Sequence, residues 1–391
     1  MNYNHPLKNG STLSIRLMCA IVFVVFSFAW LYFFQADVMT AAQHVLSGGL
    51  TRYKPLLGAV IITAVLSLLQ LLVFVITRLT RRFHALTYVP SMMLLALLTD
   101  VSPEIEPGVM SFWNWLLFFL ILLLWVPVVM VARVLQSVDV DRNFTLLSRP
   151  MWINMLLMSL QIMFVAWMSN TNAVFHYRMK TEQLLVEGKY QKALEVGRQS
   201  LESDADLQML RMYALSRENA LGERLFEYPV CGTSSEMLPT NGRTRMVLYP
   251  LDSLYRFMGA RPAAPMEPMR YLQLLERRDS IVAPQVADYE LCGMLIDKDL
   301  DSFVRRLYDL HQENDTITAA TIDRLPRHYR EAMTLYTHLR AHPLIVYHNS
   351  VLEEDWQNLQ ELEAQYPDAI ERKGRVEEQY HDTYWYYYRY K

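Results

Sequence analysis

The sequence predicts an all-α protein with a membrane-spanning amino-terminal half and a water-soluble carboxyl-terminal half. Only 13 of its 391 residues are glycine, and helix-favouring Leu, Met, Ala, Glu and Arg recur throughout. Up to Met168, long apolar runs separate short charged clusters, whereas charged residues occur in nearly every turn from His176 onward. We therefore expect a membrane region to end, and a helical domain to begin, between these two residues.

Five apolar stretches are predicted to cross the bilayer. After a cytoplasmic amino terminus, residues 1–14, we expect a transmembrane region over 15–168, with spans at about 15–34, 55–77, 83–98, 112–132 and 151–168. A perpendicular helix needs roughly 20 apolar residues to span the hydrocarbon. The first stretch is too long for a signal peptide and is interpreted as an uncleaved span. The third stretch is short and contains Pro90, so its flanking charges have to decide whether it crosses.

The distribution of Lys and Arg favours five spans. If all five stretches cross, one side holds Lys8, Arg16, Arg78, Arg81, Arg82, Arg133, Arg142 and Arg149, and the other holds only Arg52 and Lys54 before the carboxyl-terminal domain. Cytoplasmic loops carry the excess of positive charge. This predicts a cytoplasmic amino terminus and places residues after 168 outside the cytoplasm. Arg178 and Lys180 argue weakly against this, but large domains translocate largely regardless of charge.

Composition and polar residues narrow the function. A net charge of −3 supplies no basic surplus for nucleic acid. Pumps and transporters need ionisable groups at membrane depth, and none is expected in the five spans. The amides of Gln70, Asn114, Asn154 and Gln161 are interpreted as hydrogen bonds between helices. The spans are therefore expected to act as an anchor or a partner-binding bundle, without a cofactor.

A repeat-like pattern follows the last span. Tyr177, Leu184, Gly188, Tyr190 and Ala193 stand at the spacing of a helical hairpin, and Gly222 follows Gly188 by 34 residues. Tyr289, Cys292, Gly293 and Ile296 repeat the order of a first hairpin helix. The pattern resembles the tetratricopeptide repeat, which implies a short solenoid of stacked helical hairpins over residues 176–366.

Two segments interrupt or follow these repeats. Residues 229–268 are rich in Pro and Gly, and are interpreted as an irregular insertion, either a functional loop or a tolerated surface segment. The tail, 367–391, contains the aromatic run Tyr384, Trp385, Tyr386, Tyr387 and Tyr388. It could dock on the last helices as a cap, contact the membrane surface or hold a ligand.

The combination of five spans, repeat-like helices and an aromatic tail resembles an uncharacterised membrane protein family of Bacteroidota. The resemblance implies an inner membrane and a periplasmic domain, and it brings no activity with it.

Two hypotheses of function follow. The first is a membrane scaffold whose exported helical domain binds a protein partner in the cell envelope. The alternative is a membrane enzyme that acts on a lipid-linked envelope substrate at the outer face, with Asp37, His44, Glu104 and Glu106 as candidate residues. No known catalytic motif is present. His338 and His342 lie one helical turn apart, but we interpret them as solvated and expect no metal site.

The cysteines of the exported half pose a separate question. Cys231 and Cys292 could pair in an oxidising compartment. Against this, Cys292 stands at an apolar position of a predicted helix, and Cys231 lies in the irregular insertion. The sequence leaves both a disulfide and two separate thiols open.

Overall fold

The computed structural model describes residues 7–101, 112–137, 148–278, 283–312 and 323–391. Within these ranges every regular element is a helix, so the predicted all-α class is confirmed for the described part of the chain. Contacts divide the chain into two compact units, Met1–Met179 and Lys180–Lys391. The boundary falls inside helix α7 (Ala173–Val186).

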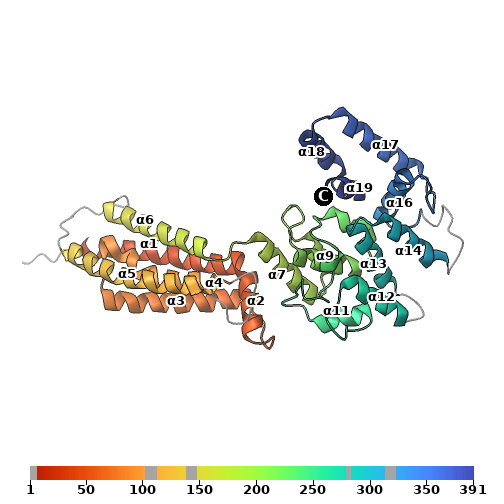
Figure 1. The fold of residues 1–391 in the computed structure, drawn as a ribbon. Helices are drawn as coiled ribbons and strands as arrows, with labels where there is room; N and C mark the ends of the chain where they lie inside the picture. Colours follow the sequence, from red (N-terminus) through yellow and green to blue (C-terminus); the bar gives the residue numbers. More distant parts are fainter. Residues whose placement is uncertain (1–6, 102–111, 138–147, 279–282, 313–322) are drawn as a thin grey trace, which may run out of the picture. The chain divides into compact units, whose positions relative to one another are not determined.

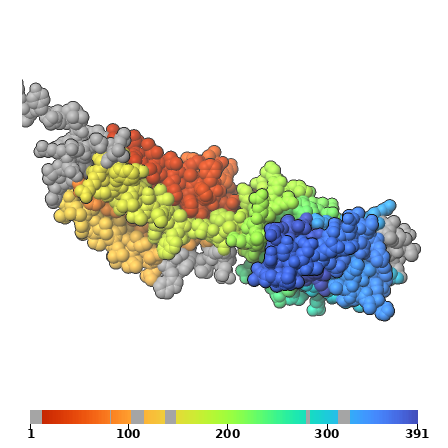
Figure 2. All heavy atoms as spheres, turned by 90° about the horizontal axis from the view of Figure 1, so that it is seen from above, coloured from red at the N-terminus to blue at the C-terminus, as the bar shows by residue number. Residues whose placement is uncertain are grey.

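The first unit is a helical bundle (Figure 1). Its elements before α7 are α1 (Leu7–Ala29), the π-helix η1 (Trp30–Phe34), α2 (Ala36–Leu46), α3 (Pro55–Thr77), the 3-10 helix η2 (Arg81–Tyr88), α4 (Val89–Thr99), α5 (Phe112–Ser137) and α6 (Arg149–Met168). Within the described residues, four helical stretches are long and apolar enough to cross a membrane: Leu13–Phe34, Pro55–Thr77, Trp115–Gln136 and Arg149–Met168. In Figure 2, α6 in yellow lies along α1 in red, which agrees with their contacts.

The third predicted span, residues 83–98, folds as two consecutive short helices. The 3-10 helix η2 ends at Tyr88, and α4 begins at Val89 with Pro90 in its first turn. Proline lacks an amide hydrogen for the preceding turn, so it interrupts a regular ladder of hydrogen bonds at this point. Most side chains of η2 and α4 are buried. This pair therefore forms the centre of the bundle, while the count of five spans stays a prediction.

The central pair runs antiparallel to α3. Gln70 Nε2 donates to the Thr87 hydroxyl at 2.9 Å, and the Ser91 hydroxyl donates to the carbonyl oxygen of Leu66 at 2.9 Å. Later residues of η2 and α4 thus meet earlier residues of α3. These bonds satisfy buried polar groups that would otherwise be costly in an apolar surrounding.

The same pair runs parallel to α6. The Ala85 amide donates to Asn154 Oδ1 at 2.8 Å, and Gln161 Nε2 donates to the Ala85 carbonyl at 3.0 Å. At the other end, the hydroxyls of Thr99 and Ser169 are 2.6 Å apart. The described amides therefore link neighbouring helices, and the central pair contacts α6 along most of its length.

The expectation that the spans hold no ionisable group was wrong at His84. This side chain is buried within residues 83–98. Its Nδ1 lies 3.2 Å from the carbonyl oxygen of Leu79, and its ring packs edge-on against Phe74 and Tyr88. His84 is thus a hydrogen-bonded core group of the bundle. His84 is the second residue of the stretch 83–98, whose start is uncertain from the sequence, so it was not counted among the ionisable groups of the spans.

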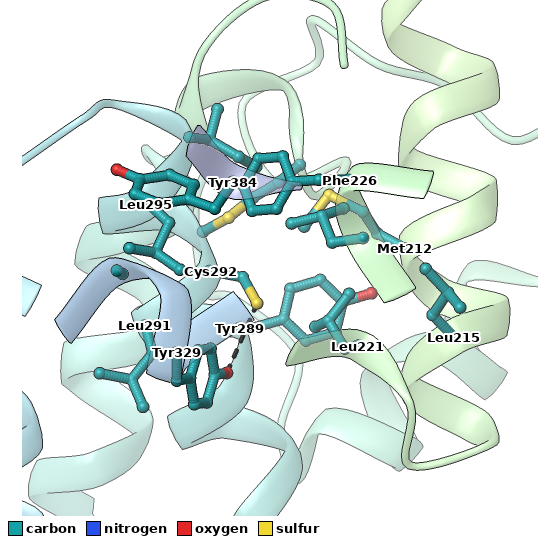
Figure 3. Close-up of a cluster of buried hydrophobic side chains, with 14 of the residues drawn as sticks. Met212, Leu215, Leu221, Phe226, Tyr289, Leu291, Cys292, Leu295, Tyr329 and Tyr384 are labelled. Carbon is teal, nitrogen blue, oxygen red and sulfur yellow. Dashed lines mark hydrogen bonds between the residues drawn. The ribbon is translucent and has the colours of Figure 1, made fainter. Parts of the chain in front are cut away.

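The second unit packs many short helices around one core. Beyond α7, its elements are α8 (Tyr190–Glu195), α9 (Ala205–Arg217), α10 (Leu221–Arg224), η3 (Leu225–Glu227), η4 (Ser234–Glu236), α11 (Leu251–Met258), α12 (Pro268–Arg278), α13 (Pro284–Ile296), α14 (Leu300–Gln312), α16 (Arg327–Leu339), α17 (Ser350–Gln365), α18 (Ala369–Tyr380) and α19 (Tyr384–Tyr390). Figure 3 shows the core where Met212, Tyr289, Tyr329 and Tyr384 meet from four different helices.

The helices only partly follow the predicted hairpin pattern. After Gly188, which ends the first hairpin helix with φ 70°, α8 is six residues long, too short for a full second helix. By contrast, α13 and α14 do form a hairpin, joined through Lys298 at φ 59°. Tetratricopeptide-like repeats therefore remain a prediction.

Residues 229–268 contribute apolar side chains to the core, while other residues of the segment are exposed. Met237, Leu254 and Met258 of this segment are buried in the main cluster. Its irregular backbone needs hydrogen-bond partners from elsewhere, and the buried Glu182 carboxylate of α7 accepts the amides of residues 247, 248 and 249 at 2.8, 2.6 and 3.1 Å. Asp206 and Asp297 accept two more amides, from residues 245 and 234. These side chains fix a segment that has little helix of its own.

Candidate binding cleft

A cleft of about 610 Å³ opens in the second unit. Its walls come from two distant parts of the sequence, the loops that flank α9 and η3 and the last two helices, α18 and α19. The lining residues are Arg198, Gln199, Ser200, Leu201, Phe226, Glu227, Tyr228, Pro229, Val230, Glu377, His381, Asp382, Tyr386, Tyr387 and Lys391. This volume lies within the range of roughly 300 to 1,000 Å³ that ligand pockets occupy.

Aromatic side chains form the base of the cleft. Phe226, Tyr228, Tyr386 and Tyr387 are all buried. The rings of Phe226 and Tyr387 lie 4.8 Å apart, and the Tyr387 hydroxyl donates to the carbonyl oxygen of Ile296 at 2.7 Å. Burial raises the pKa of Tyr387 to about 12, so its hydroxyl stays protonated and can donate. The base of the cleft therefore consists of packed aromatic rings that carry tyrosine hydroxyl groups.

A buried carboxylate attaches the tail helix to the domain. Glu331 of α16 accepts the backbone amide of Tyr384 at 2.7 Å through Oε2. Its backbone carbonyl accepts Trp385 Nε1 at 2.8 Å. Thr383 adds an N-cap, because its hydroxyl accepts the amide of Tyr386 at 3.2 Å. These contacts fix α19, and with it one wall of the cleft.

His328 joins this wall to the opposite one. Its Nδ1 lies 3.0 Å from Glu331 Oε2, and its Nε2 accepts the backbone amide of Phe226 at 3.3 Å. Because Nε2 accepts, the ring proton lies on Nδ1, which donates to Glu331. The buried His328 ring also packs edge-on against Phe226 at 5.0 Å. One side chain thus fixes the spacing between the two walls.

Charges of both signs surround the opening. Arg198 pairs with Glu227 at 3.3 Å, and Asp382 pairs with Arg327 at 2.8 Å. Burial alone would raise the pKa of Asp382, but the hydrogen bond from Arg327 holds it below its ordinary value. Lys391 lies over the Tyr386 ring, with its Nζ 5.9 Å from the ring centre. Leu201 is 79% exposed at the rim.

The predicted repeat-signature residues fall outside the cleft. Tyr177 and Leu184 are half-buried on α7, and Ala193 is buried on α8. Tyr190 begins α8 and packs under the guanidinium of Arg217 at 4.9 Å.

Gly222, Gly293 and Tyr289 instead pack in the core. A Cβ atom on Gly222 would lie 2.6 Å from the Tyr329 ring, and one on Gly293 would lie 2.8 Å from Met269 Sδ. Tyr289 is fully buried. These positions are structural contacts between helices.

The aromatic run of residues 384–388, unlike the repeat-signature residues, lies partly in the cleft. Tyr384, Trp385, Tyr386 and Tyr387 are buried as α19, and Tyr388 is half-buried with its ring 6.0 Å from that of Tyr384. Two of these five residues, Tyr386 and Tyr387, line the cleft.

Two of the four residues of the enzyme alternative lie in the described part of the chain. Asp37 and His44 lie in the first and last turns of α2, and Glu104 and Glu106 lie outside the described residues. His44 packs against Gly49, where a Cβ atom would lie 3.3 Å from its Cε1.

No metal centre forms among the described side chains. Within these ranges no group of three or more His, Cys, Asp and Glu side chains could hold a metal ion. His338 does not pair with His342. Its Nε2 lies 2.7 Å from Glu353 Oε2, while His348 Nδ1 lies 3.1 Å from the other oxygen of the same carboxylate. Glu353 thus binds His338 and His348 through its two oxygens.

The cysteines are separate thiols. Cys19, Cys231 and Cys292 are all free. Cys292 is buried, and its Sγ lies 3.4 Å from the Tyr329 hydroxyl, as the dashed line in Figure 3 shows. Cys231 Sγ lies 3.5 Å from the carbonyl oxygen of Ser203. Of the two readings that the sequence left open, the unpaired one is confirmed.

Sequence reasoning missed most of the cleft. His328 and Glu331 stand three residues apart on a helix whose other buried residues are mostly apolar, and that spacing was a detectable signal. No such signal marks Arg198, Tyr228 or Lys391, because their neighbours in the cleft are far away in the sequence.

The family comparison covers only one wall of this cleft. Residues 270–391 match DUF6057, a family of unknown function. The match includes α18 and α19, and it excludes the wall formed by residues 198–201 and 226–230. Comparison with curated proteins and with solved structures found no match.

Proposed function

We propose that this protein is a membrane scaffold whose carboxyl-terminal helical domain binds a segment of a partner protein in the cleft. In this proposal the chain crosses the membrane five times. Residues 180–391 then lie on the side opposite the cytoplasmic amino terminus. The resemblance noted in the sequence would make this an inner membrane and a periplasmic domain with tetratricopeptide-like hairpins.

Three observations support five crossings. Beyond a kink at Phe83, five residues of 3-10 helix and eleven of α-helix, over residues 84–99, extend roughly 26 Å, near the hydrocarbon thickness of roughly 30 Å. The pair also runs antiparallel to α3 and parallel to α6, each of which is long enough to cross. The modest hydropathy of η2 and α4 is compatible with crossing, because neighbouring helices surround this pair in place of lipid.

Contacts at one end of the bundle support the proposed orientation. The Arg16 guanidinium lies 4.5 Å from the centre of the Phe74 ring, and Arg133 donates to the carbonyls of Thr77 and Ile76 at 2.6 and 2.7 Å. These cations therefore gather where α3 ends. Such an excess marks the cytoplasmic side.

Reporter fusions test the orientation. A fusion after Arg82 should give cytoplasmic reporter activity, and a fusion after Lys180 should give activity of an exported reporter. Cytoplasmic activity at both positions would overturn the five-span topology and with it the exported domain.

The observation that carries the binding proposal is the composition of the cleft. Tyrosine and arginine are enriched at protein interfaces and at their energetic centres, and here Tyr228, Tyr386, Tyr387 and Arg198 surround one opening. Buried hydrogen bonds hold the walls in place without a ligand. A preformed site loses less conformational entropy on binding. Charges of both signs at the rim suit a polypeptide, which offers carbonyls, amides and charged side chains together.

Site-specific photocrosslinking in cells tests the binding. A benzophenone amino acid replaces Leu201, which is 79% exposed at the rim, and a matched control replaces Ile370, which is 84% exposed away from the cleft. We expect a discrete crosslinked protein at position 201 and none at position 370.

Variants of the cleft then assign the crosslink. Arg198→Glu in the same chain should abolish the crosslink at position 201, because it reverses one rim charge. Equal crosslinking at positions 201 and 370, or a crosslink at 201 that survives Arg198→Glu and Lys391→Glu together, would contradict a binding cleft.

A further inference from the structure

Two leucines in the loop between α2 and α3 are almost fully exposed. Leu46 ends α2, and Leu50 follows four residues later, with exposed fractions of 87% and 90%. The α2–α3 loop is defined here as residues 46–54. Large apolar side chains grouped on a surface mark an interaction site.

The exposure of these leucines results from an ordered turn. Gly48 and Gly49 adopt left-handed conformations, φ 59° and 81°, which favour glycine. The Gly49 amide donates to the carbonyl of His44 at 2.8 Å, and Gln43 Nε2 donates to the Thr51 hydroxyl at 2.9 Å. The turn therefore holds Leu46 and Leu50 outward in a defined arrangement.

The position of the loop indicates what covers it. Figure 1 shows α2 running across the end of the bundle, with its last turn reaching past the side of α3. One candidate span ends at Phe34 just before α2, and the next begins at Pro55 just after the loop. Phe33 and Leu56, at the adjoining ends of these two spans, are also exposed. The loop thus lies where the spans leave the hydrocarbon, at the level of the lipid headgroups.

We infer that the α2–α3 loop binds the surface of an anionic bilayer. Leu46 and Leu50 insert at the boundary between headgroups and acyl chains, and Arg52 and Lys54, both exposed, contact headgroup phosphates. Apolar side chains beside cations are the pattern of interfacial membrane segments. The inference rests on the proposed crossing of the membrane by the neighbouring helices.

Nitroxide labelling of the full chain in lipid nanodiscs tests this inference. The label is placed at Leu50→Cys, or at Leu46→Cys as a second variant, in a Cys231→Ser background in which Cys19 and Cys292 are buried. The discs contain phosphatidylglycerol. The ratio of collisions with oxygen to collisions with a water-soluble nickel chelate reports the depth of the label.

Two control positions calibrate the ratio. Leu68, on α3 and 66% exposed, should report lipid, and Ile370 should report water. We expect position 50 to give a ratio several-fold above that of position 370.

A ratio at position 50 equal to that at position 370, with position 68 in lipid, would overturn the inference and leave the membrane crossing intact. If 68 also reports water, the proposed crossing itself fails. A label at 50 shielded from both reagents would mean that protein covers the loop, which also overturns the inference.

The cations supply a second arm. Each basic residue near an anionic surface strengthens attachment by roughly fivefold. Arg52→Gln with Lys54→Gln should therefore lower the ratio at position 50 in phosphatidylglycerol toward its value in phosphatidylcholine. An unchanged ratio would rule out the headgroup contact.

Discussion

Trp125 Nε1 of α5 donates to the carbonyl oxygen of Leu86 at 3.0 Å. The same oxygen accepts the amide of Val89 at the end of the 3-10 helix. In a regular α-helix residue 90 would donate there as well, but Pro90 has no amide hydrogen. The indole therefore supplies a bond that the central helix cannot make itself, and it joins α5 to the centre of the bundle.

Removing this indole should destabilise the bundle. Trp125→Phe keeps an aromatic ring and loses the donor, at an expected cost of about 0.6 to 1.7 kcal/mol, the range for hydrogen bonds between membrane helices. Thermal unfolding of the full chain in detergent measures it. Trp167→Phe, at an exposed position, serves as the control. In a Pro90→Ala background the cost should shrink, because the substituted residue has an amide hydrogen that can donate to Leu86; equal costs in both backgrounds would contradict this account.

Two glycines should respond to alanine with opposite signs. Gly222→Ala places a Cβ atom 2.6 Å from the Tyr329 ring, and this ring cannot move easily because its hydroxyl bonds Asp288 at 3.1 Å. Overpacking of this kind costs about 1 to 3 kcal/mol. Gly374→Ala meets open space inside α18 and should stabilise by about 0.5 to 1 kcal/mol. Melting temperatures of the two variants should therefore move in opposite directions, and a shared direction would be inconsistent with the contact at Gly222.

The buried carboxylate of Glu331 should be essential for docking of α19. Glu331→Ala leaves His328 and the Tyr384 amide without an acceptor, and Arg327 keeps only Asp382. Leaving a buried donor unsatisfied costs about 1 to 3 kcal/mol for each group. Hydrogen exchange of residues 384–390 should accelerate strongly, whereas the exposed Glu354→Ala should leave it unchanged. Protection that survives Glu331→Ala would show that ring packing alone holds the tail.

Acid should loosen the same helix through Asp382. The hydrogen bond from Arg327 outweighs burial and holds the pKa of Asp382 below its ordinary 3.8. A group with a lowered folded pKa contributes stability that is present above the unfolded pKa and is lost as the pH falls through the folded pKa. Pepsin should therefore release the last residues increasingly as the pH drops below about 4. Asp382→Asn should already be loosened at higher pH and show a weaker pH dependence; an identical dependence would assign the acid effect to another carboxyl.

The helical class and the membrane-like composition could be predicted from the sequence. Both depend on local properties, which act on each stretch independently of the rest of the chain. These properties are the apolar runs that flank Arg52 and Lys54 and the scarcity of glycine. Hydropathy could not decide whether residues 83–98 cross the membrane, because it measures preference for lipid. The central helix contacts protein, so Thr87 and Ser91 are satisfied by α3 and need no lipid-compatible composition.

The cleft could not be predicted, because it depends on contacts across long distances in the sequence. His328 links Phe226 to Glu331, and Glu331 holds Tyr384, so the two walls meet only when α16 lies between them. In the same way, the sequence determined that residues 229–268 are irregular, but only the tertiary structure decided that part of this segment enters the core. Irregular backbone can enter a core when side chains from elsewhere satisfy its amides, and here Glu182 lies on a helix more than sixty residues away from the amides that it accepts.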